Sequence, residues 1–241
     1  MPLADKISLV ARVLVVPDLQ IPFNHQDSIP FLITVNDKYK CNEWVNIGDE
    51  LDFSTLSVSH LPDPDGIGFK EEFSQALEVL KEFYKIWPKT KVCVSNHTIR
   101  PIKKAIYAGV PSMFLKTYQE FLCAPSTWVW RDEWEIDGVR YIHGEGLAGQ
   151  VAHIKAAHGA RISTVHGHLH SYAGINYLNN YKGQLLWGMN VGCLIDEKSY
   201  AFKYQKHFLH KPTLGCGIVI DGGPQFIPMI LDRKLRWIGK I

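Results

Sequence analysis

Five short apolar runs in this chain each end in polar residues of the kinds that bind metal ions. Their shortness and their content of β-branched residues are typical of buried strands in a parallel sheet. Ligand sites in such sheets form beyond the carboxyl ends of the strands, so we expect the five polar ends to converge. The runs are Val13 to Pro17 before Asp18-Leu19-Gln20, Trp44 to Ile47 before Gly48-Asp49, Val92 to Val94 before Ser95-Asn96-His97, Val139 to Ile142 before His143-Gly144, and Thr164-Val165 before His166-Gly167-His168-Leu169-His170.

The last of these ends carries two histidines separated by one leucine. Side chains at alternate positions of an extended segment point the same way, so His168 and His170 can face one target, and Gly167 permits a tight turn before them. Neutral imidazole is the commonest protein ligand for transition metals. A single His-x-His taken alone is more often incidental, with both rings bonded to carbonyls or water. The four companion motifs favour metal binding.

The ordered set resembles the calcineurin-like metallophosphoesterases. Their usual signature is Asp-x-His, Gly-Asp-x-x-Asp, Gly-Asn-His, His-Gly and Gly-His-x-His, each at a strand end, and the resemblance runs from about residue 10 to about residue 195. Two positions depart from it. Gln20 stands where the family usually has histidine, and Ser95 stands where it usually has glycine. The chain is therefore a variant with Asp-x-Gln in the first motif.

The resemblance implies an α/β fold, a four-layer α/β/β/α sandwich of two mixed sheets. At 241 residues with 46% hydrophobic residues, the chain suits a single domain over residues 1–241. Residues after His170 alternate in polarity and predict antiparallel strands that supply the second sheet. These strands are expected at 172–179, 184–191, 199–205, 214–220 and 225–231. Helices are expected from near Pro30 to Tyr39 with Asp27 or Ser28 as cap, at 69–87 and at 150–158, and an irregular loop at 61–68.

The resemblance also implies a dinuclear metal site. Asp49 would bridge the two cations, because a carboxylate offers two oxygens. Gln20 could ligate only through its carbonyl oxygen, and such an oxygen donor makes Mn²⁺ the favoured metal, with Mg²⁺, Zn²⁺ and iron as alternatives. Metal one would take Asp18, Gln20, Asp49 and His170, and metal two would take Asp49, Asn96, His143 and His168.

Other polar residues beside these motifs have expected supporting roles. By the same resemblance His97 is the catalytic residue that faces the substrate and assists the leaving oxygen. Arg100 is a candidate substrate-binding clamp for phosphate, and the alternative is an exposed arginine in a solvated basic run. Glu50 and Asp52 are expected to support the site rather than to ligate metal. His25 could substitute as a donor, but a surface or loop-packing role is preferred.

Residues 101–135 are expected to form a cap insertion beside the metal site. The stretch holds many aromatic residues and is interrupted by Pro111 and Pro125. Loops on a rigid scaffold often determine specificity, and aromatic side chains above a basic rim could stack nucleobases. The preferred reading is that aromatics at helical spacing, as in Phe114, Tyr118 and Phe121, pack the cap onto its own domain.

Composition narrows the partners and the compartment. With 26 Lys and Arg against 24 Asp and Glu, the formal charge is +2, so the overall charge does not indicate nonspecific nucleic-acid binding. The five cysteines are scattered without a Cys-x-x-Cys pair, which predicts free buried thiols in a reducing compartment. No apolar span of membrane length is present. A cytoplasmic protein without membrane association is expected.

The resemblance implies a metal-dependent phosphoric ester hydrolase that uses a water activated by two metals. The expected substrate is a phosphate ester, with a phosphodiesterase, nuclease or nucleotide phosphatase ahead of a protein phosphatase. The other alternative is a catalytically degenerate binding module with the same fold. A metallo-β-lactamase fold would require His-x-His-x-Asp-His early in the chain, whereas His168-Leu169-His170 comes late. Protein partners are not indicated.

Overall fold

A computed structural model describes residues 10–57, 67–198 and 211–241 of the chain. Its first sheet is mixed. The strands β1, β2, β3 and β4 run parallel, while β10 is antiparallel to β1 and β11 to β10. The order across this six-stranded sheet is β11 (Gly223–Pro228), β10 (Gly215–Ile220), β1 (Arg12–Val16), β2 (Glu43–Asn46), β3 (Thr90–Cys93) and β4 (Trp128–Arg131).

The second sheet is also mixed. Its β6, β7 and β9 run parallel, and an antiparallel strand closes each edge, β5 beside β6 and β8 beside β9. The order across this five-stranded sheet is β5 (Glu133–Ile136), β6 (Val139–Ile142), β7 (Ser163–His166), β9 (Leu185–Val191) and β8 (Ala173–Asn179).

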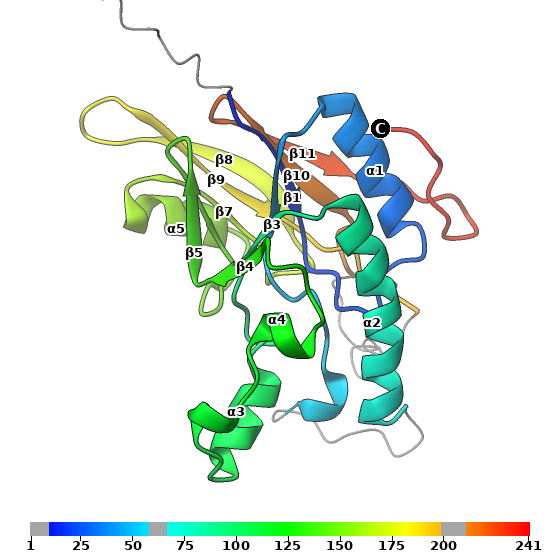
Figure 1. The fold of residues 1–241 in the computed structure, drawn as a ribbon. Coiled ribbons are helices and arrows are strands. Elements are labelled where there is room, and N and C mark those ends of the chain that lie inside the picture. The colour runs from blue at the N-terminus through cyan, green and yellow to red at the C-terminus, as the bar shows by residue number, and fades with distance from the viewer. Residues whose placement is uncertain (1–9, 58–66, 199–210) are drawn as a thin grey trace, which may run out of the picture.

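The two sheets face each other, and helices cover their outer faces (Figure 1). Helices α1 (Ser28–Tyr39) and α2 (Phe69–Ile86) lie on the first sheet, and α5 (Ala152–Ala160) lies on the second. Successive side chains of β1 point to opposite faces of the first sheet. Val13 and Val15 pack in the core between the sheets, while Leu14 and Val16 pack toward α1 and α2. The predicted α/β/β/α sandwich of two mixed sheets is confirmed.

Helix α5 lies very close to the second sheet because β9 carries a glycine beneath it. A Cβ atom on Gly188 would lie 2.0 Å from the carbonyl oxygen of His153 in α5. Only a residue without a side chain permits this approach. The contact holds α5 against the strands from which His168 and His170 follow.

The last two strands join a different sheet from the predicted one. Only β8 and β9 enter the second sheet, whereas β10 and β11 extend the first sheet beside β1. Both faces of β10 are apolar, so it fits a central position: Cys216 and Ile218 pack toward the helices and Val219 packs between the sheets. The strand expected at 199–205 and most of the loop expected at 61–68 lie outside the described residues.

The N-terminus of α1 lacks the predicted side-chain cap. Asp27 occupies the capping position but makes no capping hydrogen bond. Its carboxylate accepts hydrogen bonds instead from Arg236 Nε at 2.7 Å, Arg236 Nη2 at 2.5 Å and the backbone N–H of Trp237 at 3.0 Å. A charged, bidentate partner from the C-terminal segment outcompetes the helix amides for this carboxylate.

Residues 101–135 contain both a projection and two edge strands. Helix α3 (Arg100–Tyr107), the 3-10 helix η2 (Ser112–Phe114) and α4 (Tyr118–Phe121) extend beyond one end of the sheets (Figure 1). The chain then returns as β4 and β5, one edge strand in each sheet. A second 3-10 helix, η1 (Ser54–Leu56), follows the loop after β2. The cap stays a prediction for the projecting part.

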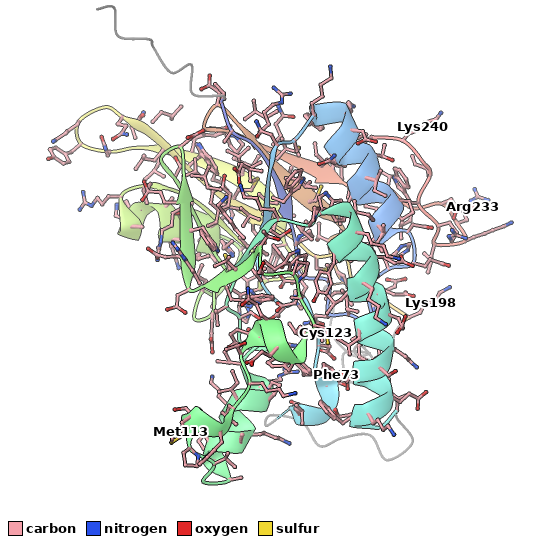
Figure 2. All side chains as sticks on the ribbon, viewed as in Figure 1. Phe73, Met113, Cys123, Lys198, Arg233 and Lys240 are labelled. Atoms are coloured by element: carbon pink, nitrogen blue, oxygen red, sulfur yellow. The ribbon has the colours of Figure 1, made fainter. Side chains whose placement is uncertain are left out.

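The five cysteines are free, but they are not all buried. Cys93, Cys193 and Cys216 are buried, Cys41 is half-buried, and Cys123 is exposed beside α4 (Figure 2). The prediction of buried thiols is therefore wrong for Cys123, which lies just beyond the short helix α4. Among the described residues, no helix is both long enough and apolar enough to span a membrane.

Candidate metal centre

The loops after β1, β2, β6 and β7 bring five acidic and imidazole side chains together between the two sheets. Two groups form there, and within each group the potential ligand atoms lie within 4.8 Å of one another. Asp49 belongs to both. The first triad is Asp18, Asp49 and His170, and the second triad is Asp49, His143 and His168. Five of the seven predicted metal-ligand residues therefore lie together, and their division between two metal positions stays a prediction.

The backbone around these side chains is held in an unusual conformation. Gln20, Asp49 and His168 have left-handed φ angles of 47°, 51° and 67°. Such conformations cost a non-glycine residue about 1–3 kcal/mol each and are concentrated at functional sites. Hydrogen bonds hold two of them, since the backbone N–H of Gln20 donates to Asp49 O at 2.8 Å and that of Asp49 donates to Ser95 Oγ at 2.9 Å.

Gly48 explains how the second loop passes so close to its neighbours. Its φ is 106°, and a Cβ atom there would lie 2.8 Å from His143 Nδ1 and 2.8 Å from Ser95 Cβ. Glycine is therefore required on both conformational and steric grounds. The turn places Asp49 beside the imidazole of His143.

Asp18 is fully buried and is held by the late histidine motif. Its Oδ2 accepts a hydrogen bond from the backbone N–H of His168 at 2.8 Å and lies 2.9 Å from His170 Nε2. Its Oδ1 has no hydrogen-bond partner among the described residues. One oxygen is thus fixed by the protein, and the other is available to a ligand.

Asp49 is surrounded by imidazoles. Its Oδ1 lies 3.5 Å from His143 Nε2, and its Oδ2 lies 3.8 Å from His97 Nε2. Burial favours the neutral carboxyl, but positive charge on His143 and His97 outweighs it and holds the pKa of Asp49 well below its ordinary value. Asp49 is therefore an anion near neutral pH.

The buried oxygens provide a test of whether this donor set fits metal ions. Asp18 Oδ1 and Asp49 Oδ2 are both buried without a hydrogen-bond partner in the described structure. Leaving buried charged oxygens unpaired costs free energy, and such groups in native proteins call for an explanation. A divalent cation in each triad would pair them. The mixture of carboxylate oxygen and imidazole nitrogen suits Mn²⁺, Zn²⁺ or iron.

Asn96 lies next to the second triad, of which His168 is a member. Asn96 Oδ1 lies 2.8 Å from His143 Nε2, so its amide oxygen is beside a potential ligand atom. Burial and the nearby charge of His143 lower the pKa of His168. A lowered pKa keeps the imidazole neutral with a free lone pair, which is the form that binds metal.

Gln20 enters the site chiefly through its backbone. It is buried, and its N–H bonds to Asp49 as described above. Within the described ranges its side-chain amide makes no hydrogen bond to Asp18, Asp49 or His170. Its place as a ligand of metal one stays a prediction.

His97 lies beside the second loop, with each ring nitrogen engaged. Nδ1 is 2.8 Å from the carbonyl oxygen of Asp52 and 2.9 Å from its Oδ1, while Nε2 is 2.9 Å from Arg100 Nη2. Burial disfavours the charged ring, but Asp49 and Asp52 outweigh it and raise the pKa of His97. A protonated Nε2 cannot accept from Arg100, so the Arg100 contact requires the neutral ring.

Arg100 is not the exposed arginine of a solvated basic run. Its Nη1 donates to the carbonyl oxygens of Asp52 at 2.7 Å and Phe53 at 3.4 Å, and only 16% of its side chain is exposed. The guanidinium therefore supports the loop after β2. Its predicted role as a phosphate clamp would require it to turn away from His97.

Two residues that the sequence patterns did not single out support the site. Thr98 Oγ1 donates to Glu50 Oε2 at 2.8 Å and lies 2.6 Å from Ser95 Oγ, and Trp130 Nε1 donates to Glu50 Oε1 at 3.0 Å. Burial raises the pKa of Glu50. The departure at Ser95 was the available signal, because its hydroxyl accepts the Asp49 N–H. A glycine at this position could not make that bond.

His25 does not approach the metal centre. Its Nε2 lies 3.0 Å from the carbonyl oxygen of Leu235, and its Nδ1 accepts from the backbone N–H of Asp27 at 3.1 Å. The ring is buried and ties the loop after β1 to the C-terminal segment, in line with the packing role preferred from the sequence.

Comparison with known proteins adds three solved structures of limited similarity. No protein-family model matches the chain, and no curated protein matches it. Vacuolar Protein Sorting 29 from Cryptosporidium parvum is 14% identical, with 90% of this chain and 95% of that chain covered and a TM-score of 0.42. YfcE, a phosphoesterase from E. coli, is 12% identical, with coverage of 94% and 96% and a TM-score of 0.46. Nuclease MPE from Pseudomonas putida is 10% identical, with coverage of 90% and 85% and a TM-score of 0.35.

Similarity at this level supports no assignment of activity.

Proposed function

We propose that this protein is a metal-dependent phosphoesterase of the calcineurin-like type that uses two divalent cations. One observation carries the proposal: two triads of ligand-type side chains, with Asp18, Asp49 and His143 buried and the two late histidines half-buried, share Asp49. A shared carboxylate between two cation positions is the arrangement by which two-metal hydrolases act on phosphate esters. The orphaned oxygens of Asp18 and Asp49 support it independently.

The residues would divide between the cations as the sequence motifs predict. When bound, the paired cations would lower the pKa of a water molecule and offset negative charge on the phosphoryl oxygens. Mn²⁺ is the favoured metal, and Mg²⁺, Zn²⁺ and iron are alternatives. Asp18, Gln20, Asp49 and His170 would hold the first cation, and Asp49, Asn96, His143 and His168 would hold the second.

His97 would assist departure of the leaving oxygen. Asp52 anchors Nδ1, which leaves Nε2 as the nitrogen that faces Asp49 and Arg100. Once Arg100 has turned away, Nε2 could take up a proton from solvent and pass it to the leaving oxygen, and general acid catalysis of this kind contributes about 10²–10⁴ in rate. Arg100 would bind a phosphoryl oxygen once it leaves His97.

Nucleotides or nucleic acids are the proposed source of the phosphate ester, ahead of phosphoproteins. The projecting segment from Arg100 to Lys116 also carries Lys103 and Lys104 and no acidic residue. A basic segment that begins beside the metal centre would attract a polyanion. A phosphodiesterase or nuclease and a nucleotide phosphatase both fit this charge.

A catalytically degenerate binding module is the second candidate. Two observations favour it: Gln20 replaces an imidazole donor, and Arg100 occupies the reactive nitrogen of His97. Asp49 and the late histidines are retained, which favours the hydrolase.

Turnover by metal-stripped protein tests the two candidates. Hydrolysis of bis-p-nitrophenyl phosphate and of p-nitrophenyl phosphate is measured with and without restored Mn²⁺. The proteins compared are wild type, His97→Ala and His158→Ala, the last as a control at an exposed histidine. The hydrolase predicts turnover that needs Mn²⁺, falls in His97→Ala and persists in His158→Ala. Diester cleavage indicates a phosphodiesterase or nuclease, and cleavage of the monoester alone indicates a phosphatase. No turnover with either ester and with any of the four metals, in protein that binds two cations, would support the binding module.

A further inference from the structure

A hollow lies between α2, α3 and the loop before α4. It has a volume of about 280 Å³. Its lining is almost entirely apolar, and four of its eight residues are phenylalanines. The residues that matter here are Phe53, Phe69, Phe73, Phe121, Ile102 and Lys116. Lys116 supplies the one charged side chain of this lining.

The phenylalanine rings are aligned rather than randomly packed. Phe69 and Phe73 are stacked with their centroids 5.7 Å apart and an interplanar angle of 7°. Phe53 is stacked on both, at 6.4 Å from Phe69 and 6.2 Å from Phe73. Phe121 approaches Phe73 at 6.4 Å from the opposite element, α4, and Figure 2 shows Phe73 on the side of α2 that faces α4. Aligned rings form a wall onto which a further planar ring can stack.

One ring of this wall is incompletely packed. Phe69 is 42% exposed, whereas Phe53 is buried. An exposed aromatic residue at the mouth of an apolar hollow loses the free energy of burial that its type usually gains. A ligand ring in the hollow would cover it.

Two short pieces of chain connect the lining of the hollow to the metal centre. Phe53 directly follows Asp52, which holds His97, and its carbonyl oxygen accepts from Arg100. The lining residue Pro101 directly follows Arg100. The apolar wall and His97 are therefore linked through two residues, Asp52 and Arg100.

We propose that this hollow is a substrate subsite that binds an aromatic ring of the phosphate ester. The inference rests on the proposed function and specifies the substrate's organic group. Small-ligand sites are typically apolar hollows of about 300–1,000 Å³ with a few polar groups, so a single ring is a suitable occupant here. With the ring in place, the phosphate would lie toward Arg100 and the metal centre. Lys116 would meet further negative charge on the ligand.

The shared chemistry is a planar aromatic ring, and it has two sources. The ring could be an aryl group attached to a phosphoryl oxygen, or it could be a nucleobase separated from the phosphate by a ribose. Stacking on phenylalanine accepts either, because every base has a π face. Two pairs of ligands separate the sources.

Isothermal titration calorimetry of the Mn²⁺-loaded protein tests the subsite without turnover. Phenylphosphonate is compared with methylphosphonate, and the 5′-phosphonate analogue of adenosine is compared with that of ribose, so that no ligand has a cleavable ester. In wild type we expect at least one ring-bearing ligand to bind about tenfold more tightly than its ringless partner, as stacking energies predict. A gain in the first pair only identifies an aryl group, and a gain in the second pair only identifies a nucleobase.

Three variants attribute the gain to the hollow. Phe69→Ala should abolish most of the preference for the ring and leave methylphosphonate binding unchanged. Phe69→Leu keeps apolar volume without a ring, so its preference for the ring-bearing ligand should lie between those of wild type and Phe69→Ala. Phe114→Ala is the matched control, because Phe114 lies in the same projection, is 71% exposed and is absent from the lining. Phe69 sits at the first turn of α2 and is partly exposed, so its replacement spares the core.

The outcomes separate this inference from the proposed function. Equal affinities within both ligand pairs would overturn the subsite, even if the protein hydrolyses esters. A preference for the ring that survives Phe69→Ala would overturn it as well. If ring-bearing phosphonates bind through Phe69 while no ester is hydrolysed, the subsite stands and the proposed hydrolase fails.

Discussion

Gly167 and Asp18 lie so close together that no side chain fits between them. A Cβ atom on Gly167 would lie 2.2 Å from Asp18 Oδ1 and 2.6 Å from Ile47 Cγ2. Asp18 Oδ1 is the oxygen that has no partner in the described structure. The glycine of the late histidine motif therefore determines where the first motif's carboxylate can point.

Replacing this glycine should damage the first metal position. In Gly167→Ala the added methyl group must displace Asp18 or the turn before His168, and overpacking of this kind costs about 1–3 kcal/mol. We expect weaker binding of one Mn²⁺ by calorimetric titration and a lower urea midpoint. Gly159→Ala is the control, because a Cβ atom there meets nothing within 4 Å. Unchanged Mn²⁺ binding in Gly167→Ala would show that Asp18 is not a ligand.

Gln20→His should strengthen the first position. An imidazole at this buried site would supply the donor that Asp-x-His signatures carry, and imidazole binds transition metals more strongly than an amide oxygen does. The expected result is tighter binding of the weaker of two Mn²⁺ ions, with the other unaffected. If competition against a metallochromic indicator shows equal affinities, Gln20 does not contact metal.

The ion pair between Asp27 and Arg236 predicts a pH effect on stability that is independent of metal. The hydrogen bond from Arg236 lowers the pKa of Asp27 from 3.8 to about 2. A lowered folded-state pKa contributes stability that is complete above the unfolded value and is lost as the pH falls from 3.8 toward 2.

Thermal unfolding of wild type and Asp27→Asn along an acid series measures this contribution. We expect Asp27→Asn to melt at a lower temperature than wild type at neutral pH, and the gap to narrow progressively below pH 3.8. The gap should be modest, because 53% of the Arg236 side chain is exposed and solvent screens the pair. A gap of constant size throughout the series would contradict the ion pair.

The buried bonds among Ser95, Thr98 and Glu50 predict a cost for removing one hydroxyl. Thr98→Val keeps the shape of the side chain but leaves Glu50 Oε2 without its donor and the Ser95 hydroxyl proton without its acceptor. An unsatisfied buried polar group costs about 1–3 kcal/mol, which should appear in the free energy of unfolding in urea. Thr34→Val is the control, since Thr34 bonds to Pro30 O on an exposed helix face. Equal losses in the two variants would contradict a specific role for Thr98.

Local patterns predicted much of the strand framework and the set of site residues. Runs such as Val13 to Val16 are apolar on both faces, which distinguishes a buried central strand, and polar residues directly after such a run mark its carboxyl end. Because the ends of β1, β2, β6 and β7 meet between two facing sheets, five of the seven predicted ligand residues came together in the two triads. Metal binding by these residues stays a prediction.

Long-range partners could not be predicted from the same patterns. Arg100 belongs to a basic run in the sequence, yet carbonyl groups about 50 positions earlier hold it. Asp27 has the local pattern of a helix cap, yet Arg236 outcompetes the helix amides. The sheet that β10 joins depends on its pairing with β1, and its apolar sequence suits either sheet. In each case the deciding interaction lies far away along the chain.

The number of metal ions bound by wild type and by Asp49→Asn is the most direct measurement of the central claim. Metal-stripped protein is loaded with Mn²⁺, desalted, and examined by native mass spectrometry, with Asp196→Asn as a control. Asp196 also follows a strand, but it lies outside both triads. The shared carboxylate predicts two ions for wild type and for Asp196→Asn, and one or none for Asp49→Asn. Two ions retained in Asp49→Asn would contradict a bridging role for Asp49.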